Sequence, residues 1–282
     1  MKEGSVLGLG PSGFHRMHYV EWGDPRNPRV VICAHGLTRN GRDFDELAKA
    51  LADHYRVVCP DVVGRGRSDH VPVKEYEYGV YCGDMTALIA RLGVDSLDWI
   101  GTSMGGLIGI VLGSRKKSPI RRLVLNDIGP FIPGAALGRV TTYTGTAGPF
   151  ADRGTGEAFI RDSLVGYRDL PAPLWRQAME HSFVRTKDGR YALAYDPAIG
   201  EALRAGGPAK DVDMWGFWDR LPGPVLALRG GASDFLTADI AAEMERRGPK
   251  AKVVSYPGVG HPIPLMNPDE IALVRDWLLA PT

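Results

Sequence analysis

The chain has 282 residues, 44% of them hydrophobic and 24% charged, and carries a formal net charge of +1 at pH 7. These proportions are ordinary for a globular protein and exclude a disordered or fibrous chain. Lysine and arginine are spread along the sequence, which leaves no basic stripe for binding a nucleic-acid backbone.

The N-terminal segment favours an antiparallel edge strand at residues 14–22 and shows no targeting signal. MKEGSVLGLGPSG lacks the continuous apolar core of a signal peptide, and no later window reaches the roughly 18 apolar residues of a membrane span. Gly8, Gly10 and Gly13 match the G-x-G-x-x-G of dinucleotide-binding proteins, but that motif needs a strand before it and a helix after it. Here the alternating segment FHRMHYVEW follows instead. We therefore expect a cytoplasmic protein with no membrane partner and no nucleotide cofactor, either a monomer or a homodimer.

Beyond residue 29, short β-branched runs alternate with amphipathic segments of helical length. The expected strands are residues 30–34, 55–60, 97–101, 121–127, 223–230 and 251–258. The expected helices are residues 43–52, 78–92, 104–114, 238–247 and 268–280. Strands that alternate with helices in this way are typical of a parallel sheet covered on both faces. The sequence therefore predicts an α/β fold with a mostly parallel sheet.

The alternation is interrupted once, by a long stretch rich in aromatic residues, glycine and proline. This stretch covers residues 130–215 and predicts mainly short helices joined by turns. We expect residues 1–129 and 216–282 to form the core of the fold, with residues 130–215 inserted as a subdomain.

A serine lies between the strand at 97–101 and the helix at 104–114. Gly101-Thr-Ser103-Met-Gly105 fits G-x-S-x-G, the sharp turn that exposes a nucleophilic hydroxyl at the carboxyl edge of a sheet. The two glycines remove side chains that would collide in such a turn. The free N–H groups of the following helix favour a developing anion. Ser103 is therefore the candidate nucleophile, although the same pattern fits a serine that only caps a buried helix.

A serine nucleophile also needs an anion-stabilising pocket. His35-Gly36-Leu37 directly follows the strand at 30–34. We expect the backbone N–H groups of Leu37 and Met104 to form an oxyanion hole, with His35 ordering the loop through hydrogen bonds.

The remaining catalytic groups are expected after the last strands. His261 follows the strand at 251–258 and is the candidate general base. Asp234 follows the strand at 223–230 and is the predicted acid, which would fix the imidazole tautomer and stabilise the imidazolium. Asp127, at the end of the strand at 121–127, is the competing acid.

Together these motifs resemble the α/β-hydrolase superfamily over nearly the whole chain. The matching stretches are His35-Gly36, residues 60–68 (PDVVGRGRS), the turn GTSMGG, Asp234 and Gly260-His261. The resemblance implies an α/β-hydrolase fold in which residues 130–215 form a cap over the active site. The chain looks most like bacterial esterases, enol-lactonases and meta-cleavage-product hydrolases, whose turn often reads S-M-G-G. Epoxide hydrolases and haloalkane dehalogenases of this fold use an aspartate nucleophile, and Ser103 argues against both.

The predicted function is hydrolysis of a small to medium carboxylic ester through an acyl-enzyme, without metal or cofactor. The three cysteines are odd in number and show no CxxC spacing, so they indicate neither a zinc site nor a disulfide framework. Thr38, Arg39, Tyr143 and Trp215 are candidates for substrate contact. Arg39 would either meet a substrate carboxylate or lie solvated in its loop. The alternatives are a meta-cleavage-product C–C hydrolase, a lactonase, a hydroxyalkanoate-oligomer hydrolase, a lyase or perhydrolase, and a ligand receptor on the same fold.

Overall fold

An eight-stranded sheet runs through the computed structural model, which describes residues 1–281. The strand order is β1-β2-β4-β3-β5-β6-β11-β12. β1 and β2 pair antiparallel, as do β2 and β4, and all other neighbours are parallel. The strands are β1 (Lys2–Gly10), β2 (Gly13–Trp22), β3 (Val30–Ala34), β4 (Arg56–Pro60), β5 (Leu97–Thr102), β6 (Ile120–Asn126), β11 (Val225–Gly230) and β12 (Lys252–Tyr256). The predicted mostly parallel α/β sheet is confirmed.

The N-terminal hairpin corrects one expectation. β1 pairs with β2 along its whole length, so β1 is the edge strand and residues 14–22 lie one position inside the sheet. β1 was not predicted because its two fully buried positions are Gly8 and Gly10, while Leu7 and Leu9 are exposed. A Cβ on Gly8 would lie 1.9 Å from a carboxylate oxygen of Asp84, which explains the glycine there. The G-x-G-x-x-G stretch is therefore a β-hairpin and not a dinucleotide-binding turn.

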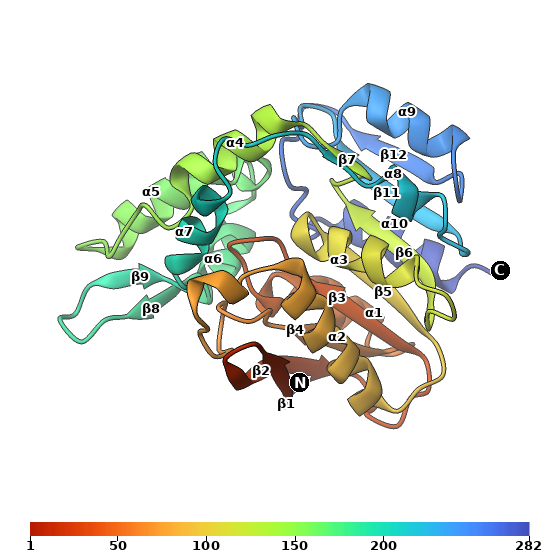
Figure 1. Cartoon of the computed structure of the whole chain (residues 1–282), viewed down its shortest axis with the longest axis horizontal. Helices are drawn as coiled ribbons and strands as arrows, with labels where there is room; N and C mark the ends of the chain where they lie inside the picture. Colours follow the sequence, from red (N-terminus) through yellow and green to blue (C-terminus); the bar gives the residue numbers. More distant parts are fainter. Residues whose placement is uncertain (282) are drawn as a thin grey trace.

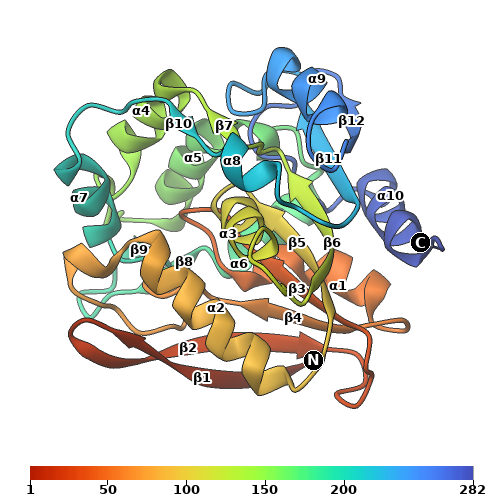
Figure 2. The same cartoon turned by 45° about the vertical axis from the view of Figure 1, so that its right-hand side comes forward.

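Helices cover both faces of the sheet. One hydrophobic cluster packs α2, α3 and α9 on one face, and a second packs α1 and α10 on the other. Figure 2 shows α2 and α3 crossing in front of the sheet. Their bounds are α1 (Asp45–Leu51), α2 (Tyr78–Leu92), α3 (Met104–Gly113), α9 (Ala238–Arg246) and α10 (Pro268–Leu279), with short 3-10 turns η1 (Gly41–Phe44) and η2 (Val73–Glu75). No helix of residues 1–281 is both long and apolar enough to cross a membrane.

A long insertion, which we define as the residues between β6 and β11, contains two short strands, β7 near its start and β10 near its end, that form a separate small sheet. These two short strands pair antiparallel. Figure 1 shows α4, α5, α7, β8 and β9 together on the opposite side of the molecule from α10. The elements are β7 (Phe131–Ile132), α4 (Gly134–Tyr143), α5 (Arg153–Ser163), η3 (Val165–Tyr167), α6 (Ala172–Glu180), β8 (Phe183–Arg185), β9 (Tyr191–Leu193), α7 (Ala198–Ala205), β10 (Val212–Asp213) and α8 (Trp215–Trp218). The expectation of mainly short helices in this stretch is confirmed.

The insertion has a small hydrophobic core of its own. Ile160, Tyr167, Trp175 and Met179 are buried there together with Met266, which follows β12. The insertion is therefore packed against the same edge of the sheet at which β3, β5, β6, β11 and β12 end.

Candidate active site

Ser103 lies in a strained turn between β5 and α3. Its φ of 50° and ψ of −115° are unusual for a residue with a side chain. The turn is tight because α3 approaches the sheet closely: a Cβ on Gly101 would lie 2.4 Å from the Gly105 backbone, and one on Gly105 would lie 2.0 Å from the Ala34 carbonyl oxygen. The Ser103 N–H donates to the Asn126 carbonyl over 3.1 Å, which anchors the turn to β6. The local sequence therefore projects the hydroxyl from the carboxyl edge of the sheet.

The structure brings Ser103, His261 and Asp127 into one hydrogen-bonded chain. Ser103 Oγ lies 3.0 Å from His261 Nε2, and His261 Nδ1 lies 2.8 Å from Asp127 Oδ2. A carboxylate can only accept, so Nδ1–H is the donor and Nε2 of the neutral ring accepts from the serine hydroxyl. Asp127 is fully buried, and its Oδ1 accepts the Gly230 N–H over 2.7 Å. This arrangement holds the imidazole in the tautomer that can remove a proton from Ser103.

The expectation that Asp234 is the partner of His261 is wrong in this structure. The Asp234 carboxylate faces α4 and accepts two hydrogen bonds from Arg139, of 2.8 and 2.9 Å. Burial raises the pKa of the Asp234 carboxyl, but the hydrogen bonds and charge of Arg139 outweigh it and leave that pKa below its ordinary value. Both aspartates follow neighbouring strands, but Asp127 has a positive φ of 55° and turns its side chain toward His261.

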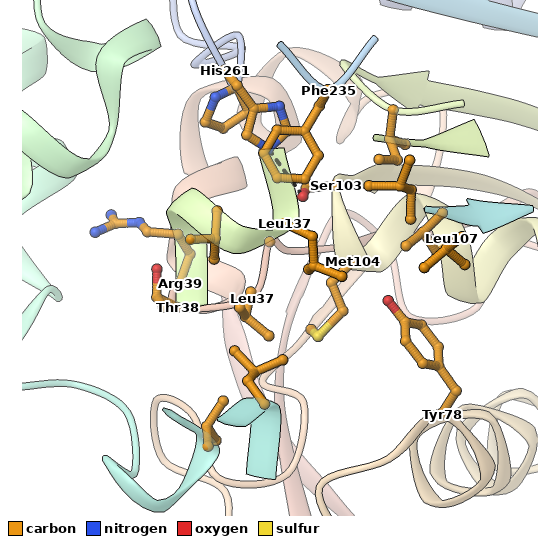
Figure 3. Close-up of a pocket in the computed structure, with 18 of the residues that line it drawn as sticks. Leu37, Thr38, Arg39, Tyr78, Ser103, Met104, Leu107, Leu137, Phe235 and His261 are labelled. Carbon is orange, nitrogen blue, oxygen red and sulfur yellow. Dashed lines mark hydrogen bonds between the residues drawn. The ribbon is translucent and has the colours of Figure 1, made fainter. Parts of the chain in front are cut away.

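Two residues that the sequence analysis missed support the site, one at His261 itself and one between the loops that carry the serine and the histidine. The Phe235 ring stacks on the imidazole with 4.1 Å between centroids and 20° between planes, an arrangement visible in Figure 3. Asn126 Nδ2 donates to Thr102 Oγ1 and to the Ile263 carbonyl, so it ties the serine turn to the histidine loop. Asn126 directly precedes Asp127 and Phe235 directly follows Asp234. These positions were the available signal, because neighbours of a site residue share its surroundings.

The two amides predicted for the oxyanion hole belong to peptide groups that are held through their carbonyl oxygens. The Ser103 carbonyl, in the same peptide as the Met104 N–H, accepts from the N–H groups of Gly106 and Leu107. The Gly36 carbonyl, in the same peptide as the Leu37 N–H, accepts from Arg39 N–H over 3.1 Å and from His35 Nδ1 over 2.7 Å. Both peptide planes are therefore fixed before any substrate arrives.

His35 is buried and neutral, and this assigns its tautomer. Burial lowers the pKa of His35 to about 4. Nδ1–H donates to Gly36, and Nε2 accepts the Val62 N–H over 2.9 Å. His35 thus orders the loop that carries Leu37, as the sequence predicts.

Acid should destabilise the fold through His35, and replacement by glutamine should remove that contribution. The unfolded chain has a histidine pKa near 6.5, so below this pH it binds a proton that the folded chain does not accept until about pH 4. The free energy of unfolding should therefore fall by about 2 kcal/mol from pH 7 to pH 5 on account of this group. Urea unfolding of wild type and His35→Gln at both pH values measures the difference. Equal losses in the two proteins would contradict the assignment.

An apolar cavity of about 270 Å³ opens beside Ser103 and His261. Figure 3 shows Leu37, Met104, Leu107, Leu137 and Tyr78 around it. Thr38 and Tyr143, two of the candidates for substrate contact, also line it. Its walls come from the core and from α4 and α7 of the insertion, so the insertion lines part of the space beside the serine.

Arg39 and Trp215 differ from their predicted roles. Arg39 lines the cavity, but its buried guanidinium pairs with Asp43 and donates to Ser182 Oγ and the Ala178 carbonyl. Figure 3 shows this guanidinium pointing away from Ser103. It is therefore neither solvated nor free for a substrate carboxylate. Trp215, the other predicted substrate contact, packs edge-on against Trp218 and beneath the Arg247 guanidinium and is not among the residues that line this cavity.

The geometry agrees with comparisons to known proteins. The alpha/beta hydrolase fold family profile matches residues 29–268. The chain belongs to this family. As a member of the α/β-hydrolase family, it is 43% identical to a 3-hydroxybutyrate-oligomer hydrolase of Cupriavidus necator, over 97% of this chain and 96% of that protein. It is 26% identical to a 2-(acetamidomethylene)succinate hydrolase of Mesorhizobium japonicum, over 85% and 84%.

A solved structure supports the same assignment. An alpha/beta hydrolase from Novosphingobium aromaticivorans superposes with a TM-score of 0.86 at 35% identity, covering 98% of both chains. The relatives are hydrolases, and hydrolase activity follows for this member of the family.

Proposed function

We propose that this α/β-hydrolase is a serine esterase that acts through an acyl-enzyme. The observation that carries the proposal is the Ser103–His261–Asp127 chain, which ends with the serine hydroxyl at an apolar cavity. His261 Nε2 takes the hydroxyl proton as Ser103 Oγ attacks the ester carbonyl, and Asp127 stabilises the imidazolium. The N–H groups of Leu37 and Met104 receive the oxyanion.

The two half-reactions share the same groups. When the tetrahedral intermediate collapses, the C–O bond to the alcohol breaks and the imidazolium gives its proton to the leaving alkoxide oxygen. A water molecule then enters, loses a proton to His261 and attacks the acyl carbon. The acid leaves and Ser103 regains its proton. Each proton therefore passes through one nitrogen, Nε2.

Short oligoesters of a hydroxyalkanoic acid are the substrate class that we favour. The support is the 43% identity to a protein named as a 3-hydroxybutyrate-oligomer hydrolase. The alignment spans nearly the whole length of both chains. The repeating unit of such an oligomer is uncharged and carries a methyl group, which suits a wall of leucine, isoleucine and tyrosine side chains. A volume of about 270 Å³ lies at the small end of ligand pockets, so a short chain fits better than a long one. Residues 130–215 act in this proposal as the cap that limits chain length.

Hydrolysis of defined esters tests the proposal. Purified enzyme is offered the linear dimer and trimer of 3-hydroxybutyrate and p-nitrophenyl esters from acetate to decanoate, with Ser103→Ala as the blank. We expect kcat/KM of at least about 10⁴ M⁻¹ s⁻¹ for dimer or trimer, and an optimum among the short p-nitrophenyl esters. Turnover that persists in Ser103→Ala would refute the nucleophile. Turnover of lactones or ring-fission dienoates alone would refute the ester assignment, and ligand-induced stabilisation without turnover would indicate a receptor.

A further inference from the structure

Arg65 is a fully buried arginine in the loop after β4. The glycines on both sides, Gly64 and Gly66, have positive φ values of 83° and 56°. A Cβ on either would lie 2.4 Å from a neighbouring side chain, that of Tyr76 or Asp61. Both positions thus require glycine, and the turn that they make directs the arginine side chain inward.

One guanidinium touches both residues of the proposed oxyanion hole. Arg65 Nε donates to the Leu37 carbonyl over 2.9 Å, and Nη2 lies 3.5 Å from Met104 Sδ. Nη1 donates to the Val63 carbonyl over 2.7 Å. The Leu37 residue is therefore held on both sides, because His35 fixes the peptide before it and Arg65 fixes the peptide after it. Leu37 and Met104 line the cavity, whereas Arg65 is not among its lining residues.

The charge of Arg65 has no carboxylate counterpart among these contacts. Its partners in the described chain are two carbonyls and a thioether, with the Tyr81 and Tyr76 rings 4.9 and 5.7 Å from the guanidinium carbon. By contrast, the buried Arg39 pairs with Asp43. Carbonyl dipoles and aromatic faces solvate a guanidinium without cancelling its charge. A positive charge thus remains beside the Leu37 carbonyl and the Met104 side chain, in a buried position where water does not screen it.

We infer that Arg65 is a positioning residue for the oxyanion hole, a conclusion that rests on the proposed serine esterase mechanism. It aims the Leu37 amide by fixing the next carbonyl, and its uncompensated charge favours the oxyanion over the neutral ester. An interaction that strengthens only as the oxyanion forms lowers the barrier without tightening substrate binding. Its loss should therefore appear in kcat and not in KM.

The test compares three variants. Arg65→Met removes charge and hydrogen bonds at similar length, and Arg65→Lys keeps the charge without the planar fork. Arg122→Met is the matched control, because Arg122 is also buried and donates only to carbonyls, those of Trp277, Leu278 and Ala280, away from the site. Hydrolysis of p-nitrophenyl butyrate gives kcat and KM, 1-butaneboronic acid probes the tetrahedral adduct, and Tm reports stability.

We expect Arg65→Met to lower kcat and boronate affinity by about 10²-fold and to change KM by less than about threefold. The kcat of Arg65→Lys should be about tenfold higher than that of Arg65→Met. Arg122→Met should have a lower Tm than wild type and the same kcat as wild type. Wild-type kcat and boronate affinity in Arg65→Met would overturn the inference. Should Arg65→Met fail to fold, Arg65→Gln takes its place, since it also removes the charge, and wild-type kcat and boronate affinity in a folded Arg65→Gln would overturn the inference. A wild-type enzyme that neither hydrolyses the ester nor binds the boronate would instead refute the proposed function, and the inference with it.

Discussion

Replacing Ser103 by alanine should lower kcat by about 10⁶-fold, and replacing His261 by alanine in the same chain should lower it no further. The two side chains form one hydrogen bond of 3.0 Å and act in a single proton transfer. Once either is gone, the other has no proton to receive or to give. The residual rate should come from the oxyanion hole and from binding alone. Steady-state hydrolysis of p-nitrophenyl butyrate by both single variants and the double variant measures this.

Ser114→Ala serves as the control for this comparison. Ser114 is a buried serine at the far end of α3, where its hydroxyl donates to the Val111 carbonyl. Its replacement should leave kcat at the wild-type value. Losses that multiply in the double variant would show that Ser103 and His261 act independently, which the acyl-enzyme mechanism does not allow.

The parts of the fold that the sequence predicted are those whose local pattern and buried environment agree. The patterns of residues 30–34 and 97–101 predict strands, and the structure has Val30–Ala34 and Leu97–Thr102. Both strands are buried on two faces, so their residues are mostly apolar, with Asp98 as the exception. β1 was missed because its inward positions carry glycine for close packing. Packing against residues distant in the chain, such as Asp84 against Gly8, decides that pattern and leaves no local signal in the sequence.

The residues of the site also differ in whether their local sequence predicts their position. The serine turn was predictable because its constraint is local, between Gly101 and Gly105. The environment of Arg39 was not, because its partners Ala178 and Ser182 lie about 140 positions later, in the insertion. Arg65 carries no local signal either, since its proposed role depends on contacts with Leu37, in the loop after β3, and with Met104, the first residue of α3.

The order of residues along the chain does not decide which aspartate is the partner of His261. β6 and β11 are adjacent and parallel, so Asp127 and Asp234 both emerge at the edge where His261 lies. Both aspartates lie between Ser103 and His261 in the sequence, so their order along the chain is compatible with either as the acid. Side-chain direction decides between them, and it depends on one positive φ at Asp127 and on the attraction of Arg139 for Asp234.

Asp127→Asn should lower kcat by about 10⁴-fold, because asparagine leaves the imidazole without a charged acceptor and favours the wrong tautomer. Asp234→Asn should change kcat only slightly. It removes an ion pair with Arg139 that is more than a third exposed on both sides, a type of pair worth at most about 1 kcal/mol of stability. Hydrolysis of p-nitrophenyl butyrate by the two variants, prepared in parallel, measures both effects. The opposite ranking would return the role to Asp234.

The double variant separates a passive Asp234 from a substitute acid. Asp234 lies at the same sheet edge, directly before Phe235, whose ring stacks on His261, so it is a candidate to replace Asp127 once that residue is lost. If Asp234 took over, Asp127→Asn would retain a rate that Asp127→Asn/Asp234→Asn loses. We expect equal kcat values for the single and the double variant, because the two hydrogen bonds to Arg139 hold the Asp234 carboxylate toward α4 whether or not Asp127 is charged.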